Sequence, residues 1–268
     1  MSNSFKTFLK HTAKDFHNQS VNPPIVRAST IIFKSMQDIR KTQDKAKKNP
    51  IGGHFDYGRQ GTSTTHILQQ ILSKLEESYF TFLTPTGFGA VFLAIFSVTR
   101  PGDEIIVADP VYSPTRLLSQ DFLKEFNIKT TFYDPHDLKT LEKAITNKTK
   151  LIFVENPGSN TFDFQDLGKI ISIAKKHKIL TAIDNTWGTP YFLKPIKLGF
   201  DMSIVSATKY YSGHSDVMGG SLAVNKKVFT KVKAAERVTG LRLGPDDAYL
   251  ITRGLRTLDV RLDRHREL

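Results

Sequence analysis

The stretch SATKYYSGHSD, residues 206–216, places one lysine, Lys209, among hydroxyl side chains. It follows the run MSIV, residues 202–205, which is short, apolar and β-prone and is therefore typical of a buried strand. Lys209 would lie just beyond the carboxyl end of that strand, where open α/β sheets bind their ligands. The position predicts a ligand site around Lys209.

The side chains of residues 206–216 indicate which class of ligand this site would bind. A lysine held near a buried site can lose its proton and form an imine with an aldehyde, and hydroxyls on its N-terminal side can hold a phosphate. Together these features describe an anchor for pyridoxal phosphate. The alternative is an ordinary lysine whose stem lies along the surface, followed by a polar turn.

The length and composition of the chain limit the classes of protein to which it can belong. At 268 residues the chain can bury a sizeable core without metals or disulfides, and we expect no metal site. It contains no cysteine, which excludes disulfides and thiolate catalysis. The first residues lack an apolar leader, and no apolar stretch approaches membrane-spanning length. We therefore expect a cytoplasmic protein with no membrane partner.

The formal net charge is +12, which would suit a polyanionic partner such as nucleic acid. However, the lysines are spread over predicted helix faces, and the densest cluster, residues 41–48, precedes Pro50 in a predicted surface segment. No basic stripe interleaved with aromatic residues accompanies them. We interpret the charge as a solvated basic face and expect no nucleic-acid partner.

Residues 1–62 carry turn signals and little periodicity, which predicts an extended arm. Within it, Tyr57-Gly58-Arg59 sets a phenol beside an arginine whose planar donors suit a phosphate. Residues 63–244 alternate between apolar β-prone runs and helical patterns, which predicts a mostly parallel sheet wrapped by helices. The predicted strands are 104–108, 128–133, 151–155, 179–183 and 202–206.

Further candidates lie at the ends of predicted strands or the start of a helix. Gly87 and Phe88 open a buried helix, where free N–H groups can bind an anion; a tight turn needed only for packing is the alternative. Tyr112 could stack on a flat cofactor, and Asp184 could pair with a protonated pyridine nitrogen. The alternatives are a core tyrosine and an Asx turn. Tyr112, Asp184 and Lys209 all follow predicted strands and would lie at the same edge of the sheet, which favours their belonging to a single site.

In these features the chain resembles the Cys/Met-metabolism group of pyridoxal-phosphate enzymes over essentially its whole length. The resemblance rests on Tyr57-Gly-Arg59, Thr86-Gly87, Tyr112, Asp184-Asn-Thr-Trp187, Ser206-Ala-Thr-Lys209-Tyr and Gly213-His-Ser-Asp216, in the family's order and approximate spacing. It implies an α/β fold of PLP fold type I, aspartate-aminotransferase-like, with a mostly parallel seven-stranded sheet. Residues 63–244 would be the PLP-binding domain.

The resemblance also implies roles. Lys209 would be the Schiff-base lysine that moves the Cα proton, Asp184 would pair with the ring nitrogen, and Tyr112 would stack on the ring and assist catalysis. The phosphate would be bound by Ser206, Thr208 and the amides of Gly87 and Phe88, and by Tyr57 and Arg59 from a neighbouring subunit. Trp187 and Tyr57 would shape the substrate pocket. Arm residues 1–62 would then contact that neighbour in a homodimer or homotetramer.

Within the family, Trp187 and the segments 155–159 and 247–257 look most like bacterial cystathionine β-lyase. That resemblance implies β-elimination from a sulfur amino acid, L-cystathionine. Cystathionine γ-synthase, cystathionine γ-lyase and methionine γ-lyase are alternatives, and a non-catalytic remnant or basic binding module is another.

Residues 245–268 resemble the start of the helix that leads to the family's C-terminal small domain. We expect that domain to be absent and the chain to be truncated, with weakened substrate binding, because in the family the domain supplies the arginine that binds the substrate α-carboxylate. We also expect Leu255, Leu258 and Leu262 to be exposed.

Overall fold

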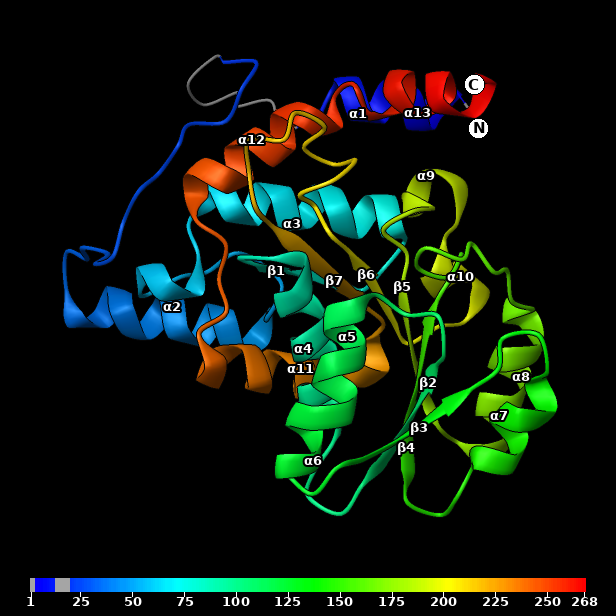
Figure 1. The fold of residues 1–268 in the computed structure, drawn as a ribbon. Helices are drawn as coiled ribbons and strands as arrows, with labels where there is room; N and C mark the ends of the chain where they lie inside the picture. Colours follow the sequence, from blue (N-terminus) through cyan, green and yellow to red (C-terminus); the bar gives the residue numbers. More distant parts are fainter. Residues whose placement is uncertain (1–2, 13–19) are drawn as a thin grey trace.

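The computed structural model describes residues 3–12 and 20–268. Its centre is a sheet of seven strands in the order β1-β7-β6-β5-β4-β2-β3 (Figure 1). β7 runs antiparallel to its neighbours β1 and β6, and the other pairs are parallel. The strands are β1 (Phe80–Thr84), β2 (Glu104–Ala108), β3 (Lys129–Tyr133), β4 (Thr149–Glu155), β5 (Leu180–Asp184), β6 (Met202–Val205) and β7 (Gly220–Val224). The prediction of a mostly parallel, seven-stranded sheet is confirmed.

Helices cover both faces of the sheet (Figure 1). One face carries α4 (Gly87–Val98), α7 (Leu138–Ala144), α8 (Leu167–His177) and α11 (Lys226–Thr239). The other carries α1 (Asn3–Lys10), α3 (Ser63–Glu76), α9 (Thr189–Phe192), α12 (Pro245–Leu255) and α13 (Leu258–Glu267). The remaining elements are α2 (Met36–Lys48), η1 (Gly58–Gln60), α5 (Ser113–Leu117), the π-helix η2 (Leu118–Phe122), α6 (Leu123–Glu125) and α10 (Pro195–Leu198).

The pleat of the strands divides the core between the two layers. Phe82 packs in the cluster that contains α4 and α11, and its neighbour Leu83 packs in the cluster that contains α3 and α12. Ile204 and Val205 divide in the same way. Alternate side chains of a strand point to opposite faces, so a strand buried on both faces reads as a continuous apolar run. This explains why the central strands were recognisable in the sequence.

The end of the chain packs differently from the expectation. Leu255 and Leu258 are fully buried and Leu262 is 1% exposed, so the prediction that these leucines are exposed is wrong. They belong to the same apolar cluster as Leu9, because α1 lies along α13 (Figure 1). A salt bridge of 2.5 Å between Lys6 Nζ and Asp263 Oδ2 joins the two helices.

The segment before α3 is not extended throughout. α2 begins after Ser35, whose hydroxyl accepts a hydrogen bond from the Asp38 N–H, and none of its residues is buried. Only three of its 13 residues, Met36, Ile39 and Ala46, are apolar, which is why the sequence pattern did not predict it. The extended conformation that we expected is therefore interrupted by α2.

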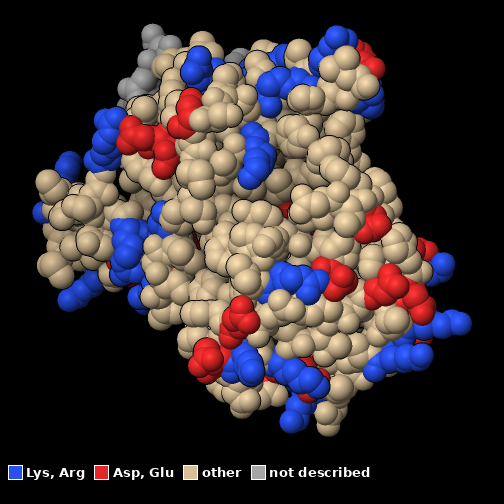
Figure 2. Space-filling model, viewed as in Figure 1, with Lys and Arg blue, Asp and Glu red and all other residues tan. Residues whose placement is uncertain are grey.

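Charges on the surface are mixed in sign. On the face shown in Figure 2, Lys and Arg side chains lie scattered among Asp and Glu side chains. Within the described ranges, none of the helices is both long enough and apolar enough to cross a lipid bilayer.

Candidate active site

The carboxyl ends of three neighbouring strands meet at one edge of the sheet. Glu155 at the end of β4 pairs in register with Asp184 at the end of β5, and Asp184 pairs with Ile204 of β6. The turn after β6 carries Ser206, Thr208 and Lys209. Parallel pairing therefore places two carboxyl groups and a lysine at the same edge, as the sequence predicts for Asp184 and Lys209.

Lys209 lies in a turn held by hydrogen bonds of the main chain. Its N–H donates to the Ser206 carbonyl at 3.1 Å, and its carbonyl accepts from the Gly213 N–H at 2.8 Å. The Thr208 hydroxyl donates to the Gly219 carbonyl at 3.2 Å and accepts from the Gly219 N–H at 3.0 Å. Thr208 thus ties the turn to the segment that enters β7.

Lys209 lines a cavity of about 540 Å³. Thr186 and Trp187 from the loop after β5 share this cavity with it, as do Glu155 and residues 157–160 from the loop after β4. The predicted pocket residue Trp187 is 53% exposed. Lys209 and the aromatic side chain of Trp187 therefore line the same cavity within one chain.

Asp184 is a desolvated carboxylate with a single hydrogen-bond donor from the main chain close by. Its Oδ1 accepts from the Thr186 N–H at 2.9 Å. Desolvation raises the pKa of Asp184, while the hydrogen bonds to Thr186 and the charge of Lys209 lower it. No salt bridge reaches Asp184 from the described residues. A cation bound in front of it would stabilise its charge.

Glu155 is a site residue to which the sequence analysis gave no role. Burial, together with the neighbouring charge of Asp184, raises the pKa of Glu155 to about 8. Its Oε2 accepts a hydrogen bond of 2.7 Å from the Tyr112 N–H. Glu155 therefore connects the residue predicted to stack on the cofactor to the carboxylate predicted to face the ring nitrogen.

The start of α4 touches the turn after β6. Thr86 caps the helix through the Gly89 N–H at 2.9 Å, and Gly87 and Phe88 begin it. A Cβ atom on Gly87 would lie 2.5 Å from the Ser206 Oγ, so only glycine fits there. The first N–H groups of α4 lie beside the Ser206 hydroxyl, an arrangement suited to an anion.

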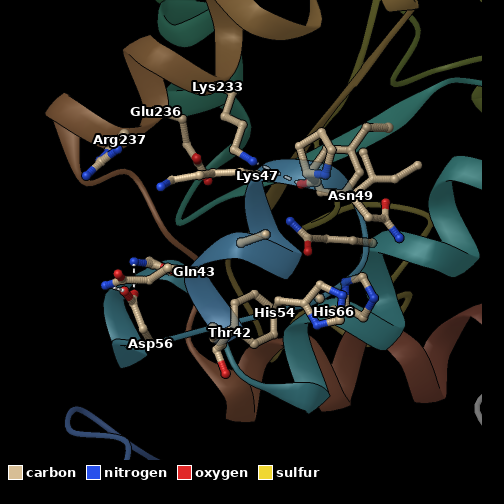
Figure 3. A pocket seen from close by; sticks show the side chains of 18 of the residues that line it. Thr42, Gln43, Lys47, Asn49, His54, Asp56, His66, Lys233, Glu236 and Arg237 are labelled. Carbon is tan, nitrogen blue, oxygen red and sulfur yellow. Dashed lines mark hydrogen bonds between the residues drawn. The ribbon is translucent and has the colours of Figure 1, made fainter. Parts of the chain in front are cut away.

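Neither Tyr57 nor Arg59 lines the Lys209 cavity. The fold of a single chain therefore does not bring these two residues to Lys209. Arg59 Nη1 donates to the Arg237 carbonyl at 3.1 Å, and Tyr57 is 45% exposed. They lie near a second cavity of about 530 Å³ between α2, α3, β1 and α11. Figure 3 shows Lys233, Glu236 and Arg237 of α11 on one side of it and His54 and His66 on the other.

Arg261 reaches the Lys209 turn from α13 and was not predicted. Its Nη1 donates to the Tyr210 carbonyl at 2.7 Å and its Nη2 to the Gly254 carbonyl at 2.8 Å. The guanidinium packs on Gly213, where a Cβ would lie 2.5 Å from Arg261 Cζ and where φ is +74°. The only signal in the sequence was the glycine itself, which a position with this backbone favours.

Comparisons with known proteins explain this arrangement. The sequence model of the family described as Cys/Met metabolism PLP-dependent enzyme matches residues 6–268 of this chain. The chain belongs to this family. Pyridoxal phosphate is therefore its cofactor, and the expectation drawn from Lys209 and its neighbours is confirmed at this level.

Individual relatives in this family differ in their names. Cystathionine β-lyase of Haemophilus influenzae is 35% identical over 95% of this chain and 64% of its own length. L-alanine/L-glutamate racemase of Wolbachia pipientis is 32% identical over 92% of this chain and 62% of its own length. The crystal structure of cystathionine γ-lyase from Lactobacillus plantarum, complexed with L-serine, has a TM-score of 0.86 and 31% identity, covering 97% of this chain and 65% of the other.

The likeness to that crystal structure confirms the PLP fold type I. The chain spans just under two thirds of the length of each of these three proteins.

The residues present fit pyridoxal phosphate. Among the described residues, no cationic side chain makes a hydrogen bond to the desolvated Asp184 carboxylate, and a protonated pyridine nitrogen would supply that missing donor. The space between Gly87 and Ser206 admits no side chain at position 87, so helix N–H groups stay accessible to a phosphate. Lys209 lines the same cavity as Glu155, whose register partner is Asp184. The chain thus carries a group for each end of the cofactor.

Proposed function

We propose that this chain forms the cofactor-binding part of a carbon–sulfur lyase that acts on L-cystathionine. The overall reaction consumes one water and yields L-homocysteine, pyruvate and ammonia. The observation that carries the proposal is the meeting of Lys209, Asp184 and the start of α4 at one edge of the sheet. Similarity to the cystathionine β-lyase of Haemophilus influenzae supports the choice of substrate.

The side chains would divide the work as follows. Lys209 would hold the cofactor and would also be the base that takes the Cα proton on Nζ. Asp184 would keep the ring nitrogen protonated, and pyridoxal phosphate, when bound, would supply the sink for the electron pair left at Cα. The Cβ–S bond breaks with its electron pair on sulfur, and the homocysteine thiolate gains a proton.

Binding roles follow from position. Ser206, Thr208 and the N–H groups of Gly87 and Phe88 would hold the phosphate, and Tyr112, fixed through Glu155, would lie against the ring. Trp187, together with Tyr57 of a second copy, would border the substrate.

Two copies would be needed for a complete site. Tyr57 and Arg59 lie outside their own chain's Lys209 cavity, and Tyr57 is exposed, so both are available to a neighbouring subunit. We propose at least a homodimer in which each chain lends these residues to the other. The Arg261 guanidinium faces main-chain carbonyls, so we assign it no role in binding the substrate α-carboxylate.

A γ-elimination is the second candidate, favoured by the 31% identity to the Lactobacillus plantarum cystathionine γ-lyase. The two reactions release different keto acids from cystathionine, pyruvate in one case and 2-oxobutyrate in the other.

The experiment is an end-point assay of the purified chain with added pyridoxal phosphate and L-cystathionine, in which both keto acids are quantified by chromatography. The proposal expects pyruvate that depends on Lys209, so Lys209→Ala should abolish it. Predominant 2-oxobutyrate would replace the proposal with the γ-reaction. A cofactor-loaded chain that releases neither keto acid would contradict a lyase function for this chain.

A further inference from the structure

Arg261 of α13 lies against the part of the turn that follows Lys209. Its Nη1 donates a hydrogen bond of 2.7 Å to the carbonyl of Tyr210, the residue next to Lys209. The guanidinium also packs on Gly213, whose N–H donates to the Lys209 carbonyl at 2.8 Å. Arg261 therefore contacts both the neighbour of Lys209 and the residue that closes the turn onto the Lys209 carbonyl.

The Arg261 guanidinium donates to neutral groups of the protein. Besides the Tyr210 carbonyl, it reaches the Gly254 carbonyl at 2.8 Å through Nη2 and the Thr257 hydroxyl at 3.3 Å through Nε. In the described part of the chain, no carboxylate forms a salt bridge with it. Hydrogen bonds from an ionised donor are stronger than those between neutral groups. One charged side chain thus ties the turn to the corner between α12 and α13.

The other side of the turn is held by a separate contact. Tyr211 is fully buried, and its phenol donates to Glu76 Oε1 of α3 at 3.2 Å. Such a buried hydrogen bond is costly to break, because its partners would lose their only contact without gaining water. This contact does not involve Arg261. We therefore expect the turn to stay folded without the Arg261 side chain and to become looser between Lys209 and Gly213.

We propose that Arg261 is a positioning residue for Lys209, which fixes the turn so that the lysine Nζ stays directed at the cofactor. The proposal rests on the proposed function, because it takes Lys209 as the residue that holds pyridoxal phosphate. Arg261 borders the Lys209 cavity, but its three nitrogens donate to protein groups, so it acts through the turn and not on the reacting atoms. A lysine would keep the charge but not the planar set of donors that reaches three acceptors at once.

The position of Arg261 predicts which step it affects. The cofactor phosphate would be held before Lys209 in the chain, by Ser206, Thr208 and the start of α4, whereas the hydrogen bond of Arg261 to the turn goes to a residue after Lys209. Loss of Arg261 should therefore slow the reaction of Lys209 with bound pyridoxal phosphate and leave the affinity for the cofactor nearly unchanged. A residue needed only for the stability of the fold would change neither quantity in the folded chain.

The first experiment mixes the cofactor-free chain with increasing concentrations of pyridoxal phosphate, stops the reaction with borohydride at set times and quantifies the adduct on Lys209 by peptide mapping. We expect Arg261→Ala to lower the rate at saturating pyridoxal phosphate about tenfold, as for the loss of a hydrogen bond from a charged group, with the half-saturating concentration kept. Arg264→Ala is the matched control and should react like the wild type, because the Arg264 side chain is 67% exposed on the same helix. An unchanged saturating rate in folded Arg261→Ala would overturn the proposal.

Chemical rescue separates positioning from folding. Arg261→Ala leaves a space beside the Tyr210 and Gly254 carbonyls that a guanidinium ion can occupy. Millimolar guanidinium chloride should speed the reaction of Lys209 in this variant and leave the wild type unchanged, whereas methylammonium, which lacks the planar donors, should not. Arg261→Lys serves if the alanine variant does not fold, and it should also react more slowly than the wild type. No rescue, equal rescue by methylammonium, or a wild-type rate in Arg261→Lys would contradict the assignment.

Amide hydrogen exchange in the cofactor-free chain tests the proposal without pyridoxal phosphate. The Gly213 N–H should exchange about tenfold faster in Arg261→Ala, because its hydrogen bond to the Lys209 carbonyl opens more often. The Asn185 N–H, which donates to the Ile204 carbonyl at 2.8 Å, is the internal reference and should keep its rate. Equal exchange of Gly213 in both chains would overturn the proposal. A wild-type chain with no adduct on Lys209 but with faster exchange in the variant would instead reject the cofactor role of Lys209 and keep the tie between Arg261 and the turn.

Discussion

Glu155→Gln should change the pH dependence of stability in the cofactor-free chain. Glu155 sits beside Asp184 at the ends of β4 and β5, and burial raises its pKa from 4.5 to about 8. A folded chain that holds this proton more tightly than the unfolded chain is stabilised most at low pH. The contribution is complete below about pH 4.5 and is lost as pH rises through about 8. Glutamine cannot ionise, yet it keeps an oxygen to accept from the Tyr112 N–H.

The size of the effect follows from the pKa difference. At about 1.4 kcal/mol for each pKa unit, the rise from 4.5 to about 8 corresponds to about 5 kcal/mol. Glu155 is partly exposed to solvent, which reduces the expected loss to about 2–3 kcal/mol. The wild-type chain should lose this much more stability than Glu155→Gln between pH 5 and pH 8.

The assay is urea unfolding of both chains at several pH values, followed by circular dichroism. Glu142→Gln on the exposed side of α7 is the matched control and should keep the wild-type dependence. If Glu155→Gln and the wild type lose stability in parallel as pH rises, Glu155 does not hold a proton in the folded chain, and its proposed partnership with Asp184 is wrong.

Two further substitutions test the packing around the site. Gly87→Ala would place a methyl group 2.5 Å from Ser206 Oγ, and such forced packing costs about 1–3 kcal/mol. We therefore expect this variant to bind pyridoxal phosphate about tenfold more weakly or worse, as measured by absorbance titration. Gly168→Ala is the control and should bind normally, because its new Cβ meets nothing closer than 3.4 Å. Leu258→Ala should lower the free energy of unfolding by about 2–5 kcal/mol in chemical denaturation, because Leu258 is fully buried under α1. Val260→Ala, 58% exposed on the same helix, should cost much less, and equal losses would contradict the packing of α13.

The sequence predicted those parts of the site that follow strongly patterned elements. Asp184 and Lys209 come directly after apolar runs, and the shared edge of parallel strands brings them together without further information. β1 and β7 were missed for different reasons. β1 begins only four residues after α3 ends, and β7, GSLAV, is built largely of small residues with little strand signal.

Contacts between distant segments could not be predicted in this way. The hydrogen bonds of Arg261 to Tyr210 and Gly254 depend on how α13 crosses the turn after β6, and no local pattern around Arg261 records that crossing. The burial of Leu258 likewise depends on α1, which lies almost the whole chain length away in sequence. The Phe162–Trp187 contact joins two loops whose approach is fixed by the pairing of β4 with β5.

The most direct measurement is borohydride reduction of the chain in the presence of pyridoxal phosphate, followed by peptide mapping. We expect one reduced pyridoxyl adduct, located on Lys209, and its loss in Lys209→Ala. Adducts scattered over surface lysines, or a mapped adduct that remains in Lys209→Ala, would contradict a cofactor site built by the turn after β6.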